Sequence, residues 1–186
     1  MPYNYLNELS KIYPLTDKGV GESTHYYTIV YNRIMEPYRN KAKGILELGV
    51  GSGDSLRMWK QYFSHAMIYG IDNNKNYKFS EHRIKVFIGN QEDTSFLLSV
   101  CNGIKSKFDF IIDDASHAPQ KILQSYRFLI TYLKIGGYYF IEDINKKDIY
   151  KLLPAVNDID FVKTRCTELY LHGMNNATML VIHRTG

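Results

Sequence analysis

The order of apolar and polar positions divides most of the chain into alternating strands and helices. Short apolar runs that end at a glycine or a polar cluster predict buried strands, whereas apolar residues that recur every three to four positions predict helices. The runs predict strands over residues 44–48, 66–71, 84–88, 108–113 and 138–141. The helical spacing predicts helices over residues 54–63, from a cap at Asp93 or Thr94 past Val100, and over 119–134.

The two ends of the chain complete this pattern. At the N-terminal end we expect an arm or short helix, followed by a helix that Ser23 or Thr24 caps and that runs to about Tyr38. Near the C-terminal end, a short helix over about 148–156 precedes two segments joined by Gly and Asn residues at 172–176, which is typical of a hairpin. The two hairpin segments are 160–170 and 177–183.

The alternation of strands and helices predicts an α/β fold with helices on both faces of the sheet. We expect a Rossmann-like, mostly parallel seven-stranded sheet to which the C-terminal hairpin adds antiparallel strands. Gly136 and Gly137 are expected to end the helix over 119–134. Ligands of such sheets bind beyond the carboxyl ends of the strands, so the polar residues there are the candidates for function.

Composition narrows the class of protein. The 186 residues carry a formal net charge of +4, with 45% hydrophobic and 23% charged residues, which suits one globular domain. The basic residues form no stripe, so nucleic-acid binding is not expected. Cys101 and Cys166 make no disulfide framework or zinc motif and are expected to be reduced, as in a cytoplasmic protein. We find no signal-peptide pattern and no apolar run of the ~20 residues that a membrane helix needs, so no membrane association is expected.

A glycine-rich loop follows the first predicted strand, in the stretch Glu47-Leu48-Gly49-Val50-Gly51-Ser52-Gly53-Asp54. Gly49 and Gly51 allow a tight turn and a close approach of the backbone to a ligand. A dinucleotide-binding loop would have a glycine where this chain has Asp54, whose carboxylate would also repel a diphosphate at the helix N-terminus. Carboxylates at Glu47 and Asp54 suit a cofactor with an ammonium and a sulfonium group, which predicts S-adenosylmethionine.

Polar residues after the next two strands extend this cofactor site. Asp72 ends the second predicted strand, where a carboxylate can accept hydrogen bonds from both ribose hydroxyls. The polar cluster at 89–93 follows the third strand. We expect this cluster to face the edge of the adenine.

Acidic and imidazole side chains follow the fourth and fifth strands. The stretch Asp113-Asp114-Ala115-Ser116-His117 ends the fourth strand, and Glu142-Asp143 ends the fifth. Adjacent parallel strands lie ~5 Å apart, so these groups are expected to meet at one edge of the sheet. Carboxylates in such a cluster repel one another, and a magnesium ion relieves this repulsion; solvated charges or pairing with a nearby lysine are the alternatives. His117 is placed to act as a base, with an ordinary surface histidine as the alternative.

Together these motifs resemble the magnesium-dependent sugar O-methyltransferases of macrolide natural-product biosynthesis, of the macrocin and mycinamicin type, and their cephalosporin-hydroxylase-like relatives. These are class I S-adenosylmethionine methyltransferases. The matching stretches extend from about residue 15 to 145, and they are Thr16-Asp17-Lys18-Gly19, His25 with Tyr27, ILELGVGSGDSLRMW, YGID, GNQED, IIDDASH and GGYYFIED.

The resemblance implies roles for individual residues. It places magnesium, with manganese as the alternative, on Asp114, Glu142 and Asp143. It makes His117 the base. The cofactor site that follows, with three neighbouring polar residues added, consists of Glu47, Gly49, Gly51, Ser55, Asp72, Asn73, Gln91 and Asp113.

The expected activity is transfer of a methyl group from S-adenosylmethionine to a hydroxyl of a sugar or glycosylated metabolite. Residues 1–40 are expected to form an arm and helix that cover the active site, and residues 41–186 to form the catalytic domain. A catechol or phenol O-methyltransferase and a non-catalytic S-adenosylmethionine-binding module are the alternatives. A small-molecule acceptor is the expected partner, and a homo-oligomer is compatible with the sequence.

Overall fold

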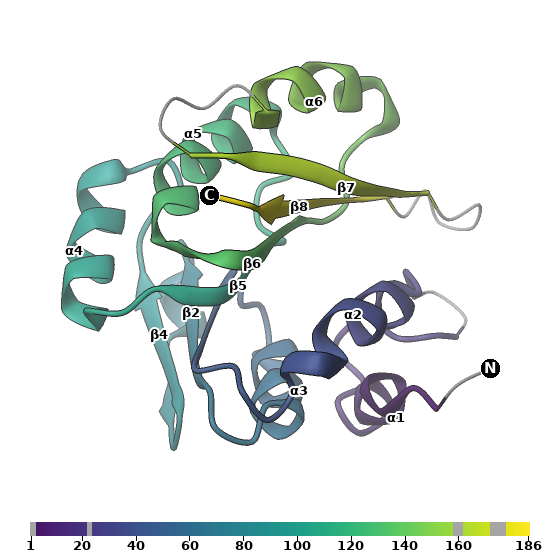
Figure 1. The fold of residues 1–186 in the computed structure, drawn as a ribbon. Coiled ribbons are helices and arrows are strands. Elements are labelled where there is room, and N and C mark those ends of the chain that lie inside the picture. The colour runs from purple at the N-terminus through teal and green to yellow at the C-terminus, as the bar shows by residue number, and fades with distance from the viewer. Residues whose placement is uncertain (1–2, 22–23, 158–161, 172–177) are drawn as a thin grey trace.

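The computed structural model describes residues 3–21, 24–157, 162–171 and 178–186. Its centre is an eight-stranded sheet of order β3-β4-β2-β1-β5-β6-β8-β7 (Figure 1). The strands are β1 (Gly44–Leu48), β2 (Met67–Asp72), β3 (Ser80–Glu81), β4 (Ile84–Ile88), β5 (Phe108–Asp113), β6 (Leu133–Ile141), β7 (Thr164–Leu171) and β8 (Thr178–Arg184).

The sheet has a parallel centre and antiparallel edges. Strands β4, β2, β1, β5 and β6 run parallel, while β8 pairs antiparallel with β6 and β7 with β8. The predicted Rossmann-like α/β class with its antiparallel C-terminal strands is confirmed. The prediction of seven strands missed only β3, a two-residue strand antiparallel to β4. In register, Leu48 pairs with Asp113, and Asp113 pairs with Ile141, so the carboxyl ends of β1, β5 and β6 meet.

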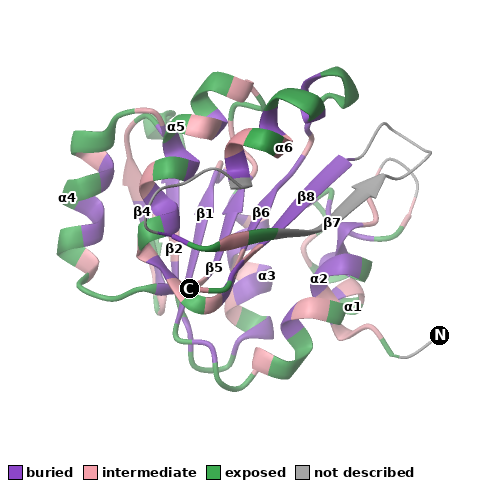
Figure 2. Cartoon of the chain, turned by 45° about the horizontal axis from the view of Figure 1, so that its top comes forward, coloured by how far each residue is buried: buried purple, intermediate pink, exposed green. Residues whose placement is uncertain are grey.

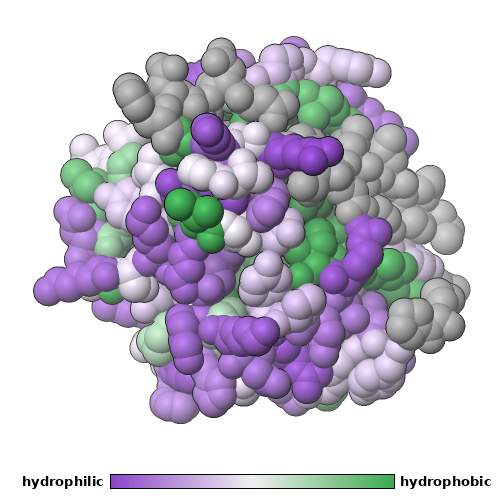
Figure 3. Space-filling view, viewed as in Figure 1, coloured by the Kyte–Doolittle hydropathy of each residue, from purple (hydrophilic) through white to green (hydrophobic). Residues whose placement is uncertain are grey.

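Helices cover both faces of the sheet, each over its own apolar core (Figures 1 and 2). One core packs α1 (Tyr5–Ile12), α2 (Tyr27–Met35) and α3 (Asp54–Tyr62) against the sheet, so the N-terminal segment shares a core with the strands. The opposite core lies under α4 (Thr94–Ile104), α5 (Pro119–Leu129) and α6 (Ile149–Asn157). On the face drawn in Figure 3, hydrophilic side chains predominate and hydrophobic ones lie in separate groups. Among the described residues no helix is long and apolar enough to cross a membrane.

The helix predicted over 119–134 ends earlier than expected. Helix α5 stops at Leu129, a short 3₁₀ turn follows, and β6 begins at Leu133. Gly136 and Gly137 therefore lie inside a strand and do not end a helix. They occupy an irregular part of the β5–β6 register, where Gly136 has a φ of +82° and a Cβ on Gly137 would lie 2.7 Å from the carbonyl oxygen of Asp109. The two glycines thus allow an irregularity in strand β6. A Gly-Gly pair is typical of such an irregularity as well as of a helix end, so the sequence alone does not separate the two.

The N-terminal cap of α2 also differs from the prediction. The helix begins at Tyr27 without a side-chain cap, and the Thr24 hydroxyl donates to the carbonyl oxygen of Gly21. The backbone N–H of Thr28 donates instead to the carbonyl oxygen of Lys18, at 2.8 Å. A carbonyl from a neighbouring segment therefore replaces the expected cap. Ser23 and the hairpin connection at 172–176 lie outside the described residues.

Candidate active site

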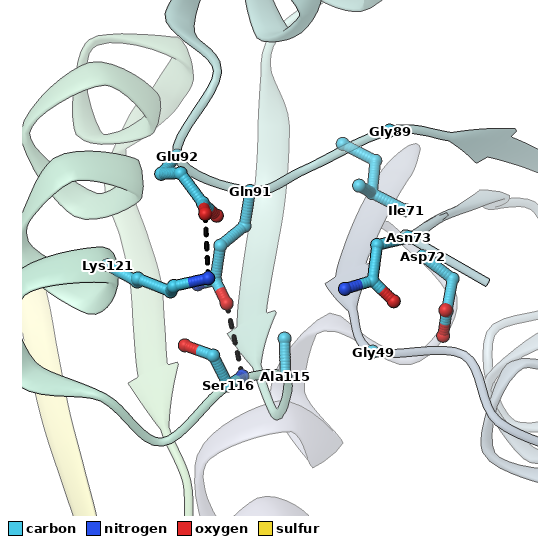
Figure 4. A pocket seen from close by; sticks show the side chains of 10 residues that line it. All are labelled: Gly49, Ile71, Asp72, Asn73, Gly89, Gln91, Glu92, Ala115, Ser116 and Lys121. Atoms are coloured by element: carbon cyan, nitrogen blue, oxygen red, sulfur yellow. Dashed lines mark hydrogen bonds and ion pairs between the residues drawn. The ribbon is translucent and has the colours of Figure 1, made fainter.

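Two pockets lie beyond the carboxyl ends of the central strands. The first is lined by Gly49, Ile71, Asp72, Asn73, Gly89, Gln91, Glu92, Ala115, Ser116 and Lys121 (Figure 4). The second is lined by Leu15, Thr16, Asp17, Lys18, Gly49, Val50, Gly51, Ser52, Ser55, Asp72, Tyr77, Asp114 and Ala115. The pockets share Gly49, Asp72 and Ala115, so they form one elongated groove along the strand ends. Six of the eight predicted cofactor residues line this groove, and Glu47 and Asp113 do not.

Gly49 of the glycine loop and Asp72 line both pockets. Gly49 has a φ of +87°, and a Cβ there would lie 2.0 Å from the carbonyl oxygen of Asp114, so only glycine fits. The Asp72 Oδ2 accepts hydrogen bonds from the backbone N–H groups of Val50 (2.8 Å) and Gly51 (3.3 Å). Asp72 therefore fixes the shape of the loop in addition to lining both pockets. Its carboxylate oxygens keep further acceptor capacity for ribose hydroxyls.

Glu47 lies beneath the groove and is fully buried. Its Oε2 accepts a hydrogen bond from the Trp59 indole at 2.8 Å, while Oε1 has no hydrogen-bond partner and lies 3.5 Å from the Lys18 ammonium. Burial raises the pKa of Glu47 to about 7, although Lys18 acts in the opposite direction. A buried carboxylate oxygen without a hydrogen-bond donor is costly, and an ammonium group is a suitable donor for it. This orphaned atom fits the predicted cofactor.

Asp113 lies behind the first pocket and acts through Gln91. It accepts hydrogen bonds from Gln91 Nε2 (3.1 Å) and from the Ser125 hydroxyl (2.9 Å), and burial raises its pKa to about 6. The Oε1 of Gln91 in turn accepts the backbone N–H of Ser116 at 3.1 Å, as Figure 4 shows. This chain of contacts sets the orientation of Gln91, which the adenine-side role requires. Asp113 is thus a positioning residue in this structure, with no surface in either pocket.

The acidic strand ends meet as predicted, but a lysine lies among them. The Lys18 ammonium, 1% exposed, lies 2.6 Å from Asp114 Oδ2 and 2.8 Å from Glu142 Oε2. The Tyr31 hydroxyl donates to the other oxygen of Glu142. Pairing with a lysine, the alternative to a metal ion, is therefore realised for Asp114 and Glu142. The stretch that contains Lys18 was part of the resemblance, yet no sequence pattern predicted its contact with residues 96 and 124 positions away.

Asp143 is held by the N-terminal segment and faces His117. It accepts a hydrogen bond from the Tyr27 hydroxyl at 2.6 Å, and His25 Nδ1 lies 3.1 Å from the same oxygen. Burial opposes ionisation of Asp143, but the contacts with His25 and Tyr27 outweigh it and lower its pKa, while the Asp143 carboxylate raises the pKa of His25. The arm therefore holds this carboxylate in its charged form.

Two groups of side chains have the donor geometry of a cation site. Ligand atoms of Asp114, His117 and Asp143 lie within 4.8 Å of one another, and so do those of Asp17, His25 and Asp143. His117 and Asp143 both have a φ of +53°, an uncommon conformation for residues other than glycine. Asp114 and Asp143, two of the three predicted metal ligands, therefore have the spacing of a cation site together with His117. The third predicted ligand, Glu142, faces Lys18 and Tyr31 instead.

Comparisons with known proteins agree with these features. No protein-family profile matches the chain. The demethylmacrocin O-methyltransferase of Streptomyces fradiae is 37% identical over 146 residues, which are 75% of this chain and 36% of that enzyme. The mycinamicin VI 2''-O-methyltransferase of Micromonospora griseorubida is 36% identical over 146 residues, with the same shares of the two chains. The chain thus spans about a third of the length of these curated relatives.

A solved structure extends the similarity to the fold. MycE, a methyltransferase from the mycinamycin biosynthetic pathway solved in complex with Mg, SAH and mycinamycin VI, superimposes with a TM-score of 0.77 at 27% identity. The match covers 97% of this chain and 54% of MycE. Sequence and structure therefore agree that the chain is a homologue of the macrolide-type sugar O-methyltransferases, with their Rossmann-like methyltransferase fold.

Proposed function

We propose that this chain is an O-methyltransferase that moves a methyl group from S-adenosylmethionine to a hydroxyl of a sugar or glycosylated metabolite, with magnesium, or alternatively manganese, as the metal. The observation that carries the proposal is one continuous groove that ends at a carboxylate pair beside an exposed imidazole. The groove and this pair share Asp114, which lines the second pocket and faces Asp143 and His117. The similarity to sugar O-methyltransferases supports a sugar hydroxyl over a catechol or phenol as acceptor.

His117 is the proposed general base. Its imidazole is exposed at the edge of the groove and near the carboxylates of Asp114 and Asp143. An acceptor hydroxyl held there loses its proton to the imidazole as its oxygen bonds to the donor methyl and the sulfur–methyl bond breaks. The residues of the chain then contribute mainly by holding the oxygen and the methyl in line.

Asp114 and Asp143 are the proposed ligands of the metal, together with Glu142 once Lys18 moves aside. These residues would hold magnesium, whose positive charge would lower the pKa of an acceptor hydroxyl. His117 is within reach of the same position, and an imidazole nitrogen that ligates a metal cannot also accept a proton. The base role therefore requires that His117 remains free of the metal, which manganese binding to a His117→Ala variant tests.

Binding and turnover measurements test the function as a whole. Calorimetry should detect S-adenosylmethionine binding and no NAD binding, because acidic residues surround the glycine loop. Methyl transfer to a sugar hydroxyl should stop in excess chelator and return with added magnesium, while binding of S-adenosylhomocysteine survives chelation. Binding of NAD alone would overturn the proposal, and full turnover in chelator would remove the metal from it. Turnover with catechols but not with glycosylated acceptors would favour the phenol alternative.

We further propose that the protein acts in the cytoplasm on small molecules without binding nucleic acid. The absence of a basic stripe in the sequence supports the lack of nucleic-acid binding. A homo-oligomer is compatible with the sequence, and light scattering would determine the oligomeric state. A substrate screen would identify the acceptor.

A further inference from the structure

The N-terminal strap, defined as residues 15–18, forms one wall of the second pocket. The glycine loop and Ser55 at the start of α3 line the same pocket. None of the cofactor-binding residues predicted from the sequence lies in the N-terminal segment. Residues 15–18 therefore add side chains to the pocket that belong neither to the glycine loop nor to the strand ends.

The strap is held at both ends. At one end, the backbone N–H of Leu15 donates to Asp54 Oδ2 at 3.1 Å. At the other end, Lys18 is anchored by its ion pairs with Asp114 and Glu142. Between these anchors, the N–H of Thr16 donates to the carbonyl oxygen of Tyr13 at 3.1 Å. Thr16 thus has a defined position in the pocket wall.

Thr16 has a hydroxyl without a partner. The residue is 8% exposed, and its Oγ1 is buried without any hydrogen bond. A buried hydroxyl that forms no hydrogen bond costs free energy, and nearly all such groups in proteins are satisfied by protein, water or ligand. A second orphaned atom, Glu47 Oε1, lies near the same pocket, beyond Lys18. One of these unsatisfied atoms belongs to a residue that lines the second pocket and the other lies next to Lys18, which also lines it, so they indicate a ligand with polar groups there.

We propose that the Thr16 hydroxyl is a cofactor-binding group that hydrogen-bonds the amino-acid end of the cofactor. This inference rests on the proposed function, since it needs an S-adenosylmethionine-type ligand in the groove. The amino-acid end carries a carboxylate and an ammonium, and a hydroxyl can donate to the first or accept from the second. The first pocket then takes the adenine and ribose, beside Gln91 and Asp72, and the strap closes over the opposite end of the ligand.

A valine at position 16 keeps the shape of the side chain and removes only the hydroxyl. Thr16→Val should weaken binding of S-adenosylhomocysteine by about 5- to 100-fold in calorimetry, because the ligand loses a hydrogen bond. Binding of 5′-methylthioadenosine, which has no amino-acid end, should be unchanged. Without ligand, the melting temperature should stay constant or rise by about 2–4 °C, because the variant no longer buries an unsatisfied hydroxyl.

Thr28→Val is the matched control. Thr28 is also a buried threonine of the N-terminal segment, but its hydroxyl donates to Asn7 Oδ1 at 3.3 Å and lies outside both pockets. This control should lower the melting temperature of the ligand-free protein and leave the affinity for S-adenosylhomocysteine unchanged. Only the Thr28→Val variant should therefore lose stability, and only the Thr16→Val variant should lose affinity for S-adenosylhomocysteine.

Three results would overturn the assignment of Thr16. They are unchanged affinity of Thr16→Val for S-adenosylhomocysteine, an equal loss for 5′-methylthioadenosine, and a lower ligand-free melting temperature. Each of these outcomes leaves the proposed function intact, provided that the wild-type protein binds S-adenosylhomocysteine. If the wild-type protein binds neither ligand, the proposed function fails first and the role of Thr16 fails with it.

Discussion

The two sides of the candidate active site, at the carboxyl ends of the strands, differ in whether their buried polar groups have hydrogen-bond partners. On the side assigned to the cofactor, at the ends of β1, β2 and β4, Glu47 Oε1 has no hydrogen-bond donor, and the Lys18 ammonium lies 3.5 Å away. On the acceptor side, at the ends of β5 and β6, each carboxylate has a partner within the protein, since Lys18 holds Asp114 and Glu142, and Tyr27 holds Asp143. The cofactor side is therefore arranged for a ligand, whereas the acceptor side is already balanced.

This difference predicts distinct behaviour of the two ligands. A cofactor enters the groove without displacing protein contacts, whereas a metal ion competes with the Lys18 ammonium for Asp114 and Glu142. Both Lys18 and Thr16 belong to the N-terminal strap, so the strap connects the two sides. The experiments below separate the sides, beginning with the one that should have the largest effect.

Loss of the imidazole at position 117 should have the largest effect on turnover and little effect on the cofactor side. His117→Ala should lower the catalytic rate by about 10²–10⁴-fold, the range for a positioned general base. The affinity for S-adenosylhomocysteine should change less than about twofold, since His117 lines neither pocket. His65→Ala, at another exposed histidine, is the control and should be neutral.

Manganese binding distinguishes the base from a metal ligand. If His117 is the base, the His117→Ala variant should bind manganese, measured by electron paramagnetic resonance, with an affinity close to that of the wild-type protein. Loss of manganese binding together with turnover would place His117 in the coordination sphere instead, with Asp114 and Asp143. Normal turnover of the variant would reduce His117 to a surface residue.

Removal of the buried ammonium should destabilise the acceptor side. Lys18→Met leaves Asp114 and Glu142 buried without their cation and should cost about 3–5 kcal/mol of unfolding free energy near neutral pH. Magnesium should recover part of this loss in the variant, because it can replace the missing positive charge. Lys134→Met is the control, because its pair with Asp109 is partly exposed and should contribute less than about 1 kcal/mol. A variant as stable as the wild-type protein would show that Lys18 does not balance these carboxylates.

Much of the fold follows from local sequence signals, and the exceptions have a common cause. The strands β1, β4 and β5 match their predicted bounds because short apolar runs end at glycine or at acidic residues. The helix predicted to extend to residue 134 ends at Leu129, and the expected cap of α2 is replaced by the carbonyl oxygen of Lys18. In both places contacts between segments distant in sequence override a local rule, and a single sequence does not contain those contacts.

The candidate active site likewise combines features that the sequence predicts with contacts that it does not. The glycine loop and the acidic strand ends are predictable, because parallel strands bring their carboxyl ends together. The contact of Lys18 with Glu142 spans 124 positions in the sequence, and the orphaned hydroxyl of Thr16 becomes visible only when the strap is folded onto the pocket. The burial of Asp113 behind Gln91 likewise depends on Ser125 of α5, since both donate to its carboxylate. Residue type predicted the chemistry of these groups, and packing determined which of them act directly.

The protonation of Glu47 gives the last test, which concerns the cofactor side alone. Its pKa in the folded protein is raised to about 7 by burial, so the folded state binds this proton more tightly than the unfolded state does. Glu47 therefore contributes most to stability below its ordinary carboxyl pKa, and the contribution is lost as the pH rises through about 7. The loss should amount to about 2–3 kcal/mol, measured as unfolding free energy between about pH 4.5 and pH 8. Glu47→Gln should remove this part of the pH dependence, and Asp113→Asn should separately remove the part due to Asp113, whose pKa is raised to about 6.

Cofactor binding should show the opposite trend with pH. The ammonium of S-adenosylhomocysteine favours the ionised form of Glu47, so affinity for this ligand should rise as the pH approaches about 7 from below. In Glu47→Gln the affinity should be lower and independent of pH over this range, whereas in Lys134→Met, whose lysine lies outside both pockets, the wild-type trend should persist. A pH trend that survives in Glu47→Gln would mean that another group carries it, and Glu47 would then be a structural carboxylate held by Trp59. The cofactor side would in that case be balanced internally, as the acceptor side is, and the contrast between the two sides would rest on Thr16 alone.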